Sequence, residues 1–254
     1  MNQKITVTII TLNEEENIRA CIESAWRVAD EVIVVDSYST DKTREIAESL
    51  GANVYKHHFM GDGLQKDYGV QFAKNDWILH MDADERLDEQ MVAEIKGINY
   101  SETDYDAFAF RRKNYIGSNW QRVWYPDYMI RLYHKDRCRF APMLVHTSLT
   151  TKKYKRMKGN IIHYSFKDLS DCISRADKYS KLDARVLFEN NLNINPWTPA
   201  VHGVVSFVKF YFLKKGIFYG LEGLTASLIG ALRSYLKYAH LIEMHQNAAL
   251  NQPD

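Results

Sequence analysis

The chain has 254 residues, of which 46% are hydrophobic and 26% charged, a composition typical of a globular protein and not of a disordered one. Its 33 basic and 32 acidic side chains leave a net charge of +1, which gives no overall field for attracting nucleic acid and excludes it as an expected partner. Three widely spaced cysteines fit neither a zinc pattern nor a disulfide framework. The amino terminus is not typical of a signal peptide, and no apolar run reaches the ~18 residues of a spanning helix. We expect a cytoplasmic protein.

The first part of the chain alternates strand and helix patterns with short connections. Residues 5–11 are β-branched throughout, as in a strand buried on both faces. Asn13 and Glu16 then resemble a helix capping box. The pattern predicts strands at 5–11, 31–36, 52–56 and 76–81, and helices after Asn13 and at about 41–50, 64–74 and 88–98. This order predicts a parallel sheet with helices on both faces.

The pattern changes beyond Tyr105. We predict short strands at 107–112, 129–133, 139–140, 145–149 and 161–164, and helices at about 168–190, 199–213 and 221–244. We therefore expect an α/β domain over residues 1–165 and a helical region over residues 166–254.

Acidic residues follow the predicted strands. Ligands of open parallel sheets bind at the carboxyl ends of the strands, where Glu14, Asp36, Asp82 and Asp84 are expected. Asp82 and Asp84 are two residues apart in an extended segment, so both carboxylates can face one point. A carboxylate pair beside a diphosphate is a usual way to hold Mg²⁺ or Mn²⁺. The sequence therefore predicts a metal at this DXD motif, where it would stabilise a leaving diphosphate.

Two of these acids also have plain structural interpretations. Asp84, or Asp88 after it, is suited to capping the next helix, which would leave no metal site. Asp36 ends an apolar strand and is placed to accept hydrogen bonds from a ribose or a base, but Asp and Ser also favour turns. Neither a G-x-G-x-x-G nor a P-loop motif is present, and carboxylates at the start of the first helix would repel a phosphate. These features favour handling of phosphates by a metal.

Four ordered motifs resemble the family 2 glycosyltransferases of GT-A fold. They are TLNEEENI, VVDSYSTDKT, the Gln65-Lys66 pair and ILHMDADE, and the resemblance covers about residues 4–135. The later segments PDYMIRLYHK (126–135), LVHTSL (144–149) and IIHYS (161–165) resemble the branch that contains lipopolysaccharide core glucosyltransferases. The resemblance implies an inverting transfer of a hexose, with UDP-glucose as the expected donor and an inner-core heptose as the expected acceptor.

The resemblance also implies a role for individual residues of the donor site. Thr11, Leu12 and Glu14 would contact the base and ribose, and Asp36 the base. Lys66, with Gln65 beside it, would lie near the base or the diphosphate.

The same resemblance implies the metal ligands. Asp82 would touch the ribose or the metal, and Asp84 would bind the metal directly. His163 would be a further metal ligand or a diphosphate contact, although it is equally well explained as a hydrogen-bonded histidine on a strand.

An inverting displacement needs a general base for the acceptor hydroxyl, and a carboxylate suits because it is ionised at neutral pH. Asp127 is the first candidate, and Arg131 is a candidate for gripping an acceptor phosphate or carboxylate. The sequence departs from the branch at Thr147, where a glutamate commonly follows the histidine equivalent to His146. That departure weakens transfer of a catalytic role to this segment.

Residues 197–219 are rich in aromatic side chains, with Lys209, Lys214 and Lys215 among them. Such a helix can lie in the headgroup layer of the inner membrane on its cytoplasmic face. The alternative is that its aromatic residues pack on the catalytic domain or on a dimer partner. The basic run at 152–158 would add attraction to anionic lipid or be a solvated turn.

The sequence therefore predicts a metal-dependent inverting glycosyltransferase that uses a UDP-sugar and a lipopolysaccharide core acceptor. Two alternatives remain. A nucleotidyltransferase shares the α/β nucleotide-binding architecture but is expected to carry a glycine-rich basic loop after the first strand. A catalytically inactive nucleotide-sugar-binding subunit would bind donor without turnover.

Overall fold

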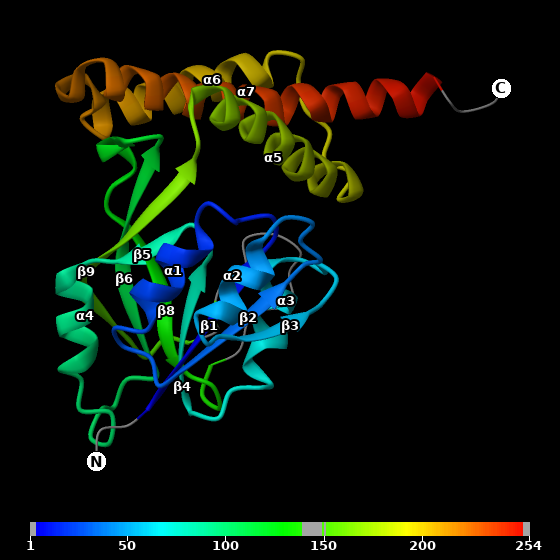
Figure 1. The fold of residues 1–254 in the computed structure, drawn as a ribbon. Coiled ribbons are helices and arrows are strands. Elements are labelled where there is room, and N and C mark those ends of the chain that lie inside the picture. Colours follow the sequence, from blue (N-terminus) through cyan, green and yellow to red (C-terminus); the bar gives the residue numbers. More distant parts are fainter. Residues whose placement is uncertain (1–3, 139–148, 150, 251–254) are drawn as a thin grey trace. The chain divides into compact units, whose positions relative to one another are not determined.

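The structure is a computed structural model that describes residues 4–138, 149 and 151–250. These residues form two compact units, one from Met1–Lys113 and Pro126–His163 and the other from Asn114–Tyr125 and Tyr164–Asp254. Figure 1 shows the elements of both.

The sheet has nine strands in the order β3-β2-β1-β4-β8-β6-β9-β5, with β7 paired to β6. The strands are β1 (Ile5–Thr11), β2 (Glu31–Asp36), β3 (Asn53–Lys56), β4 (Trp77–Asp82), β5 (Glu85–Leu87), β6 (Ala107–Ile116), β7 (Asn119–Trp120), β8 (Asp127–His134) and β9 (Tyr154–Phe166). The first four strands pair in parallel, as expected, whereas β8 is antiparallel to both β4 and β6. The sheet is therefore mixed, and β1–β4 form a parallel part of it.

Helices cover both faces of the parallel strands. They are α1 (Ile18–Ala25), α2 (Thr43–Ser49), α3 (Asp62–Val70) and α4 (Glu89–Lys96). Val7 and Ile9 of β1 belong to a core cluster that includes Ile22 of α1 and Ile95 of α4. On the other face α3 lies so close that a Cβ at Gly69 would be 3.0 Å from Val35 Cγ2. The expected α/β architecture with helices on both faces and further helices at the carboxyl terminus is confirmed.

The second unit consists mainly of helices. They are α5 (Leu169–Glu189), α6 (Thr198–Val208), a π-helical turn at Lys209–Leu213, 3-10 turns at Arg122–Trp124 and Gly216–Tyr219, and the long α7 (Gly220–Leu250). Both α5 and α6 pack against α7. Among the described residues, no helix combines the length and the apolar character that crossing a membrane would require.

Some local predictions differ from the structure. Helix α1 begins at Ile18, and Asn13 does not cap it but adopts a left-handed conformation with a φ of 54°. The basic run at 152–158 is not a turn, because β9 already begins at Tyr154. The strands predicted at 139–140 and over most of 145–149 lie outside the described residues, as do His146 and Thr147.

Candidate active site

The carboxyl ends of the parallel strands bring the predicted acids to one edge of the sheet. Thr11 pairs with Asp36 across β1 and β2, and Ile10 pairs with Asp82 across β1 and β4. Antiparallel β8 begins at this same edge, because Leu132 pairs with Leu79 and the chain from Asp127 leads toward that pair. The candidate site is therefore built from β1, β2, β4 and β8.

Asp82, the last residue of β4, is the most heavily partnered acid of the site. One carboxylate oxygen, Oδ2, accepts a hydrogen bond of 3.0 Å from Arg131 Nη2. The other, Oδ1, lies 3.4 Å from Lys66 Nζ and 3.4 Å from His80 Nε2. Burial would raise the pKa of Asp82, but Lys66 and Arg131 outweigh that effect and hold this pKa well below its ordinary value. Asp82 is therefore ionised throughout the physiological range.

Arg131 lies beneath Asp82 and pairs with a second carboxylate, that of the fully buried Glu85. Glu85 Oε2 also accepts a 3.0 Å hydrogen bond from the Asp82 backbone nitrogen, which fixes the turn between β4 and β5. Burial lowers the pKa of Arg131, but Glu85 and Asp82 outweigh burial and raise this pKa above its ordinary value. Only 2% of Arg131 is exposed. The geometry therefore supports a role for Arg131 in positioning carboxylates, beneath the surface that an acceptor would reach.

His80 lies two residues before Asp82 on the face of β4 that α3 covers. Its Nδ1 is 3.1 Å from Thr8 Oγ1 on the neighbouring β1. Burial and, after it, the charge of Lys66 lower the pKa of His80 to about 3. The imidazole is therefore neutral at physiological pH and buttresses Asp82 as a dipole.

Asp84 and His163 form a second pair. His163 Nε2 is 3.4 Å from Asp84 Oδ2, and β9 brings the histidine there because His163 pairs in register with Glu85 of β5. The helix-capping alternative applies to Asp88, whose Oδ1 accepts a 2.8 Å hydrogen bond from Met91 N at the start of α4. Asp84 is thus not the cap of that helix.

The DXD oxygens fit a divalent cation in one respect. Asp84 Oδ1 is buried and has no hydrogen-bond partner among the described groups, and Asp82 Oδ1 is buried with only the 3.4 Å contacts to Lys66 Nζ and His80 Nε2. Buried carboxylate oxygens are normally satisfied, so both atoms are suited to a cation. Within the described part of the chain, however, no group of three or more His, Cys, Asp or Glu side chains is arranged to hold a metal ion. A metal at this site would therefore need oxygens from the substrate diphosphate and water.

Asp36 and Thr11 provide further acceptors at the end of β1 and β2. Asp36 Oδ2 accepts a 3.0 Å hydrogen bond from Ser39 N, and Arg44 Nε lies 3.7 Å from the same oxygen. Asp36 Oδ1 and Thr11 Oγ1 are buried, and neither makes a hydrogen bond with any described atom. Asp36 therefore makes the expected turn contact through Oδ2, and its Oδ1 has no hydrogen-bond partner among the described atoms.

The loop after β1 is tied to the loop after β2. Asn13 N donates to Ser39 Oγ at 2.9 Å, and Asn13 Oδ1 accepts from Thr40 N at 2.8 Å. Glu14 N donates to Thr43 Oγ1 at 2.8 Å, whereas the Leu12 side chain is exposed. The backbone around Leu12 and Glu14 is held in place, which suits residues expected to contact a base and a ribose.

Gln65 and Lys66 lie next to each other on α3 but differ in their contacts. The fully buried Gln65 amide is used inside the protein, with Ser37 Oγ, His57 O and His57 Nδ1 at 3.0 to 3.1 Å. Lys66 instead reaches Asp82. Gln65 therefore anchors the amino-terminal part of α3 to the end of β2 and so places Lys66 at the acidic cluster.

Asp127 begins β8, and its Oδ2 accepts hydrogen bonds of 2.9 and 2.7 Å from Arg112 Nε and Nη2 on β6. Arg112 pairs with Asp127 in register, so the sheet itself fixes this carboxylate. Arg112, Glu85 and His80 were not among the predicted site residues. A histidine inside the apolar strand 77–82 was the one available signal for His80.

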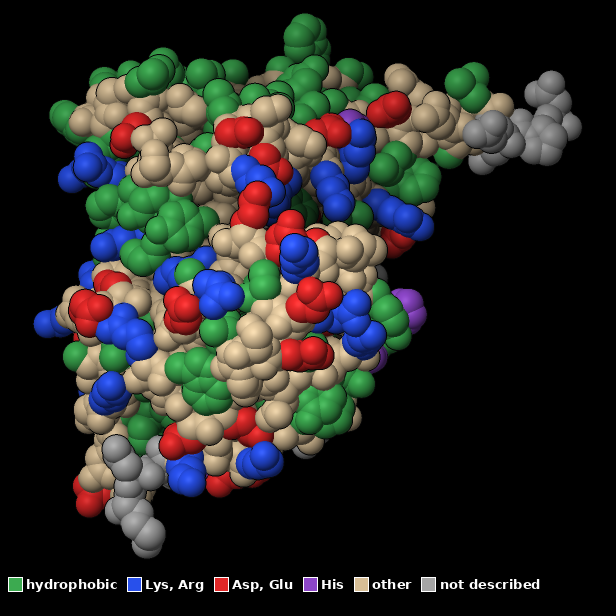
Figure 2. Space-filling view, in the orientation of Figure 1, with side chains coloured by type: hydrophobic (Ala, Val, Ile, Leu, Met, Phe, Trp, Pro, Cys, Tyr) green, Lys and Arg blue, Asp and Glu red, His purple; other side chains and the backbone are tan. Residues whose placement is uncertain are grey.

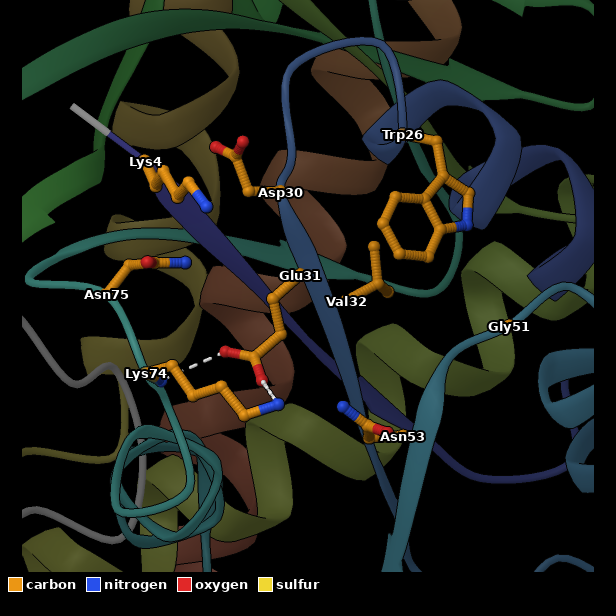
Figure 3. Close-up of a pocket in the computed structure, with 9 residues that line it drawn as sticks. All are labelled: Lys4, Trp26, Asp30, Glu31, Val32, Gly51, Asn53, Lys74 and Asn75. Atoms are coloured by element: carbon orange, nitrogen blue, oxygen red, sulfur yellow. Dashed lines mark hydrogen bonds and ion pairs between the residues drawn. The ribbon is translucent and has the colours of Figure 1, made fainter. Parts of the chain in front are cut away.

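A hollow lies at the opposite, amino-terminal edge of the parallel strands, and its lining residues are drawn in Figure 3. Glu31 there accepts a 2.9 Å hydrogen bond from Lys74 N and lies 3.3 Å from Lys74 Nζ. Asp30 Oδ2 accepts a bond from Ile5 N. Asp30 and Glu31 thus bind backbone groups at the start of β1 and in the loop before β4. They lie at the opposite end of β2 from Asp36.

Comparison with known proteins yields one family. The model of the family described as "Glycosyl transferase family 2" matches residues 6–173. An uncharacterized glycosyltransferase of Rickettsia typhi is 32% identical over 256 residues, which is 95% of this chain and 88% of the relative. The lipopolysaccharide core biosynthesis glycosyltransferase LpsC of Rhizobium meliloti is 25% identical over 256 residues, or 95% and 93% of the two chains.

Among solved structures, one match is glucosyl-3-phosphoglycerate synthase from Mycobacterium tuberculosis in complex with Mn²⁺, uridine diphosphate and glucosyl-3-phosphoglycerate. It is 24% identical, with 44% of each chain covered and a TM-score of 0.36.

Proposed function

Because the chain belongs to glycosyl transferase family 2, we propose that this glycosyltransferase moves a hexose from a UDP-sugar onto a core sugar of lipopolysaccharide. The observation that carries the donor part of the proposal is the pair of buried oxygens at the carboxyl edge of β4, Asp84 Oδ1 without a hydrogen-bond partner among the described groups and Asp82 Oδ1 with only 3.4 Å contacts to Lys66 and His80. The acceptor part is supported by the likeness over nearly the whole chain to LpsC, which is named for lipopolysaccharide core biosynthesis.

In this proposal Asp82 and Asp84 hold Mg²⁺ or Mn²⁺, with His163 as a further ligand or a diphosphate contact. The metal would draw negative charge off the departing diphosphate. Arg131 and Glu85 hold the Asp82 carboxylate and the β4–β5 turn in place, and Lys66 adds a positive charge beside them. A carboxylate that is already fixed loses less conformational freedom on binding, which favours affinity.

The donor base is assigned to the end of β2. Asp36 Oδ1 accepts an N–H of uracil or a ribose hydroxyl, and Thr11 Oγ1 offers a second polar contact. Leu12 and Glu14 complete the contact with the base and ribose through a loop that Asn13 fixes to the end of β2. UDP-glucose is the proposed donor.

Asp127 is the proposed general base. It lies at the same edge as Asp82 because β8 runs antiparallel to β4, and Arg112 holds its carboxylate in one orientation. Asp127 would accept the proton of the attacking acceptor hydroxyl as the bond to the anomeric carbon forms and the bond to the diphosphate breaks, with inversion. The acceptor is proposed to be anchored in the cytoplasmic leaflet of the inner membrane.

A transfer assay tests this function. The purified chain is incubated with Mn²⁺, a heptose-terminated core acceptor and UDP-glucose, UDP-galactose or GDP-mannose in turn. We expect UDP release together with an acceptor that gains one hexose, and fastest turnover with UDP-glucose. Binding of UDP-sugars without transfer to any core acceptor would instead favour an inactive binding subunit.

A further inference from the structure

The outward face of α6 and of the turn after it is apolar. Trp197, Val201, Val204, Val205 and Val208 follow one another at helical spacing, and all five are exposed. Trp197 is 75% exposed. An ordinary surface helix of a globular protein places such a stripe toward the core, so this helix has the reverse arrangement.

The side of α6 that packs on α7 carries small and polar residues instead. Ser206 Oγ donates a 3.0 Å hydrogen bond to Gly230 O of α7. A Cβ at Gly203 would lie 3.4 Å from Tyr235 Cβ, so α6 and α7 are in close contact. The apolar stripe of α6 is therefore turned away from α7 by the packing of the unit itself.

The turn between α6 and α7 continues the apolar face. Leu213, Phe218 and Leu221 are 76%, 78% and 79% exposed. The turn is held tightly at its base, because a Cβ at Gly223 would lie 1.9 Å from Gly216 O. The exposed side chains thus project from a fixed backbone.

We name as the apolar face the set Trp197, Val201, Val204, Val205, Val208, Phe212, Leu213, Ile217, Phe218 and Leu221, all of which are exposed. Figure 2 shows hydrophobic side chains gathered over the helices of this unit. A large exposed apolar patch on a protein surface marks an interaction site.

The charged side chains of the segment that carries this face, residues 190–221, are all basic. Between Glu189 and Glu222 the sequence contains no Asp or Glu, whereas Lys209, Lys214 and Lys215 are all exposed. None of the three lysines forms an ion pair with a described side chain. Apolar side chains beside unpaired lysines complement a surface that has an apolar interior and anionic headgroups.

A second copy of the chain is a poorer match. A two-fold dimer interface joins the same patch on both subunits, so the lysines of one face would meet those of the other with no acid from residues 190–221 to pair them. Like charges brought together in this way oppose association.

We propose that the apolar face inserts into an anionic lipid bilayer, with Lys209, Lys214 and Lys215 contacting the headgroups. The chain would then bind at the surface of the bilayer. This proposal does not depend on the donor, metal or acceptor assigned above.

The first test is flotation of the full chain with vesicles of phosphatidylethanolamine and phosphatidylglycerol, compared with phosphatidylcholine vesicles. We expect binding to the anionic vesicles only, and a loss of binding when the salt concentration is raised. The double variant Leu213→Ser/Phe218→Ser should bind at least about tenfold more weakly. The matched control Phe59→Ser/Leu250→Ser replaces one Phe and one Leu, both exposed, outside the face and should bind like the unchanged chain.

The lysines are tested separately with Lys209→Gln/Lys214→Gln/Lys215→Gln, which should weaken binding to anionic vesicles by about tenfold or more. Circular dichroism checks that each variant is folded. If the double variant is not folded, the tryptophan emission of the unchanged chain tests the proposal instead. This emission should shift to the blue on adding anionic vesicles, and Trp197→Phe should abolish most of the shift.

Equal flotation of the unchanged chain and the folded double variant would overturn the proposal, as would a vesicle-induced blue shift that persists in Trp197→Phe. A third outcome would assign the face to self-association. In that case light scattering shows a dimer that the double variant converts to a monomer, while flotation of the unchanged chain is absent.

Discussion

Arg131 Nη2 lies 3.0 Å from Asp82 Oδ2, and the same guanidinium is paired with the buried Glu85. The arginine thus holds one oxygen of Asp82, while Oδ1 of that carboxylate has only the 3.4 Å contacts to Lys66 and His80. One element of the mixed sheet, the antiparallel strand β8, fixes the acid that ends the parallel strand β4. The residues proposed to bind the donor are therefore also held in a buried ion-pair network.

Replacement of Arg131 by methionine should destabilise the protein strongly. It would leave the Glu85 carboxylate buried without its cation, and removal of one partner of a buried pair costs about 3–5 kcal/mol. Urea denaturation measures the change. Glu85→Gln added to Arg131→Met should restore part of the loss, whereas Arg137→Met, on a half-exposed arginine, should change stability by less than about 1 kcal/mol. An unchanged urea midpoint for Arg131→Met would show that Arg131 does not stabilise the buried Glu85 carboxylate.

Glu31 should make the protein sensitive to acid. Burial alone would raise the pKa of Glu31, but the bonds from Lys74 N, Thr6 Oγ1 and Lys74 Nζ together lower it. Because the pKa of the folded state is the lower one, the stabilisation is complete above the unfolded value of about 4.5 and is lost as pH falls below it.

The variant Glu31→Gln should therefore show a flatter dependence of the unfolding free energy on pH between about 5 and 3, and a lower stability near pH 7 by about 1–2 kcal/mol. Urea titrations at several pH values measure both effects. Glu23→Gln, on an exposed glutamate of α1, is the matched control and should leave the slope unchanged. If the unfolding free energy of Glu31→Gln and of the unchanged chain depended on pH in the same way, Glu31 would not be the group that makes the protein sensitive to acid.

Asp36→Asn should weaken UDP binding. The amide keeps an oxygen for Ser39 N but presents a donor where Asp36 Oδ1 now offers an acceptor to the ligand. The loss of one hydrogen bond to a charged group predicts a Kd about 10- to 100-fold higher. Isothermal titration with UDP measures it, with Asp30→Asn at the opposite edge of the sheet as the control. The base contact would have to be reassigned if both variants bound UDP equally well.

Asp127→Asn should separate turnover from donor binding. Removal of a general base lowers kcat by about 10²- to 10⁴-fold, while the Kd for UDP should change by no more than about twofold. The exposed Asp136 on the turn after β8 gives the control Asp136→Asn, which should leave both quantities unchanged. A kcat for Asp127→Asn near that of the unchanged chain would remove Asp127 from the base role.

The parallel half of the fold could be predicted because its signals are local. Runs such as 5–11 and 31–36 are apolar enough to predict buried strands, and parallel pairing then brings Asp36 and Asp82 to one edge. The predicted and observed bounds of β1 and β2 agree, whereas β5 was missed because a strand of three residues, Glu85–Leu87, has no periodic pattern of its own.

The contacts within the site were less predictable. Arg131 and Glu85 are 46 residues apart and meet only because an antiparallel strand is added to the sheet, which no local pattern encodes. Asn13 was predicted to cap a helix because Glu16 follows it at capping-box spacing, but its side chain accepts a backbone N–H outside that helix. The structure shows that this N–H belongs to Thr40 in a different loop, 27 residues away.

The central claim is that Asp84 and Asp82 bind a divalent cation together with the donor diphosphate. Isothermal titration of UDP with and without Mn²⁺ tests it on the unchanged chain, Asp84→Asn and the exposed control Asp104→Asn. We predict that Mn²⁺ tightens UDP binding to the unchanged chain and to Asp104→Asn, and that this enhancement disappears in Asp84→Asn while metal-free binding is retained. The same enhancement by Mn²⁺ in all three proteins would contradict the account.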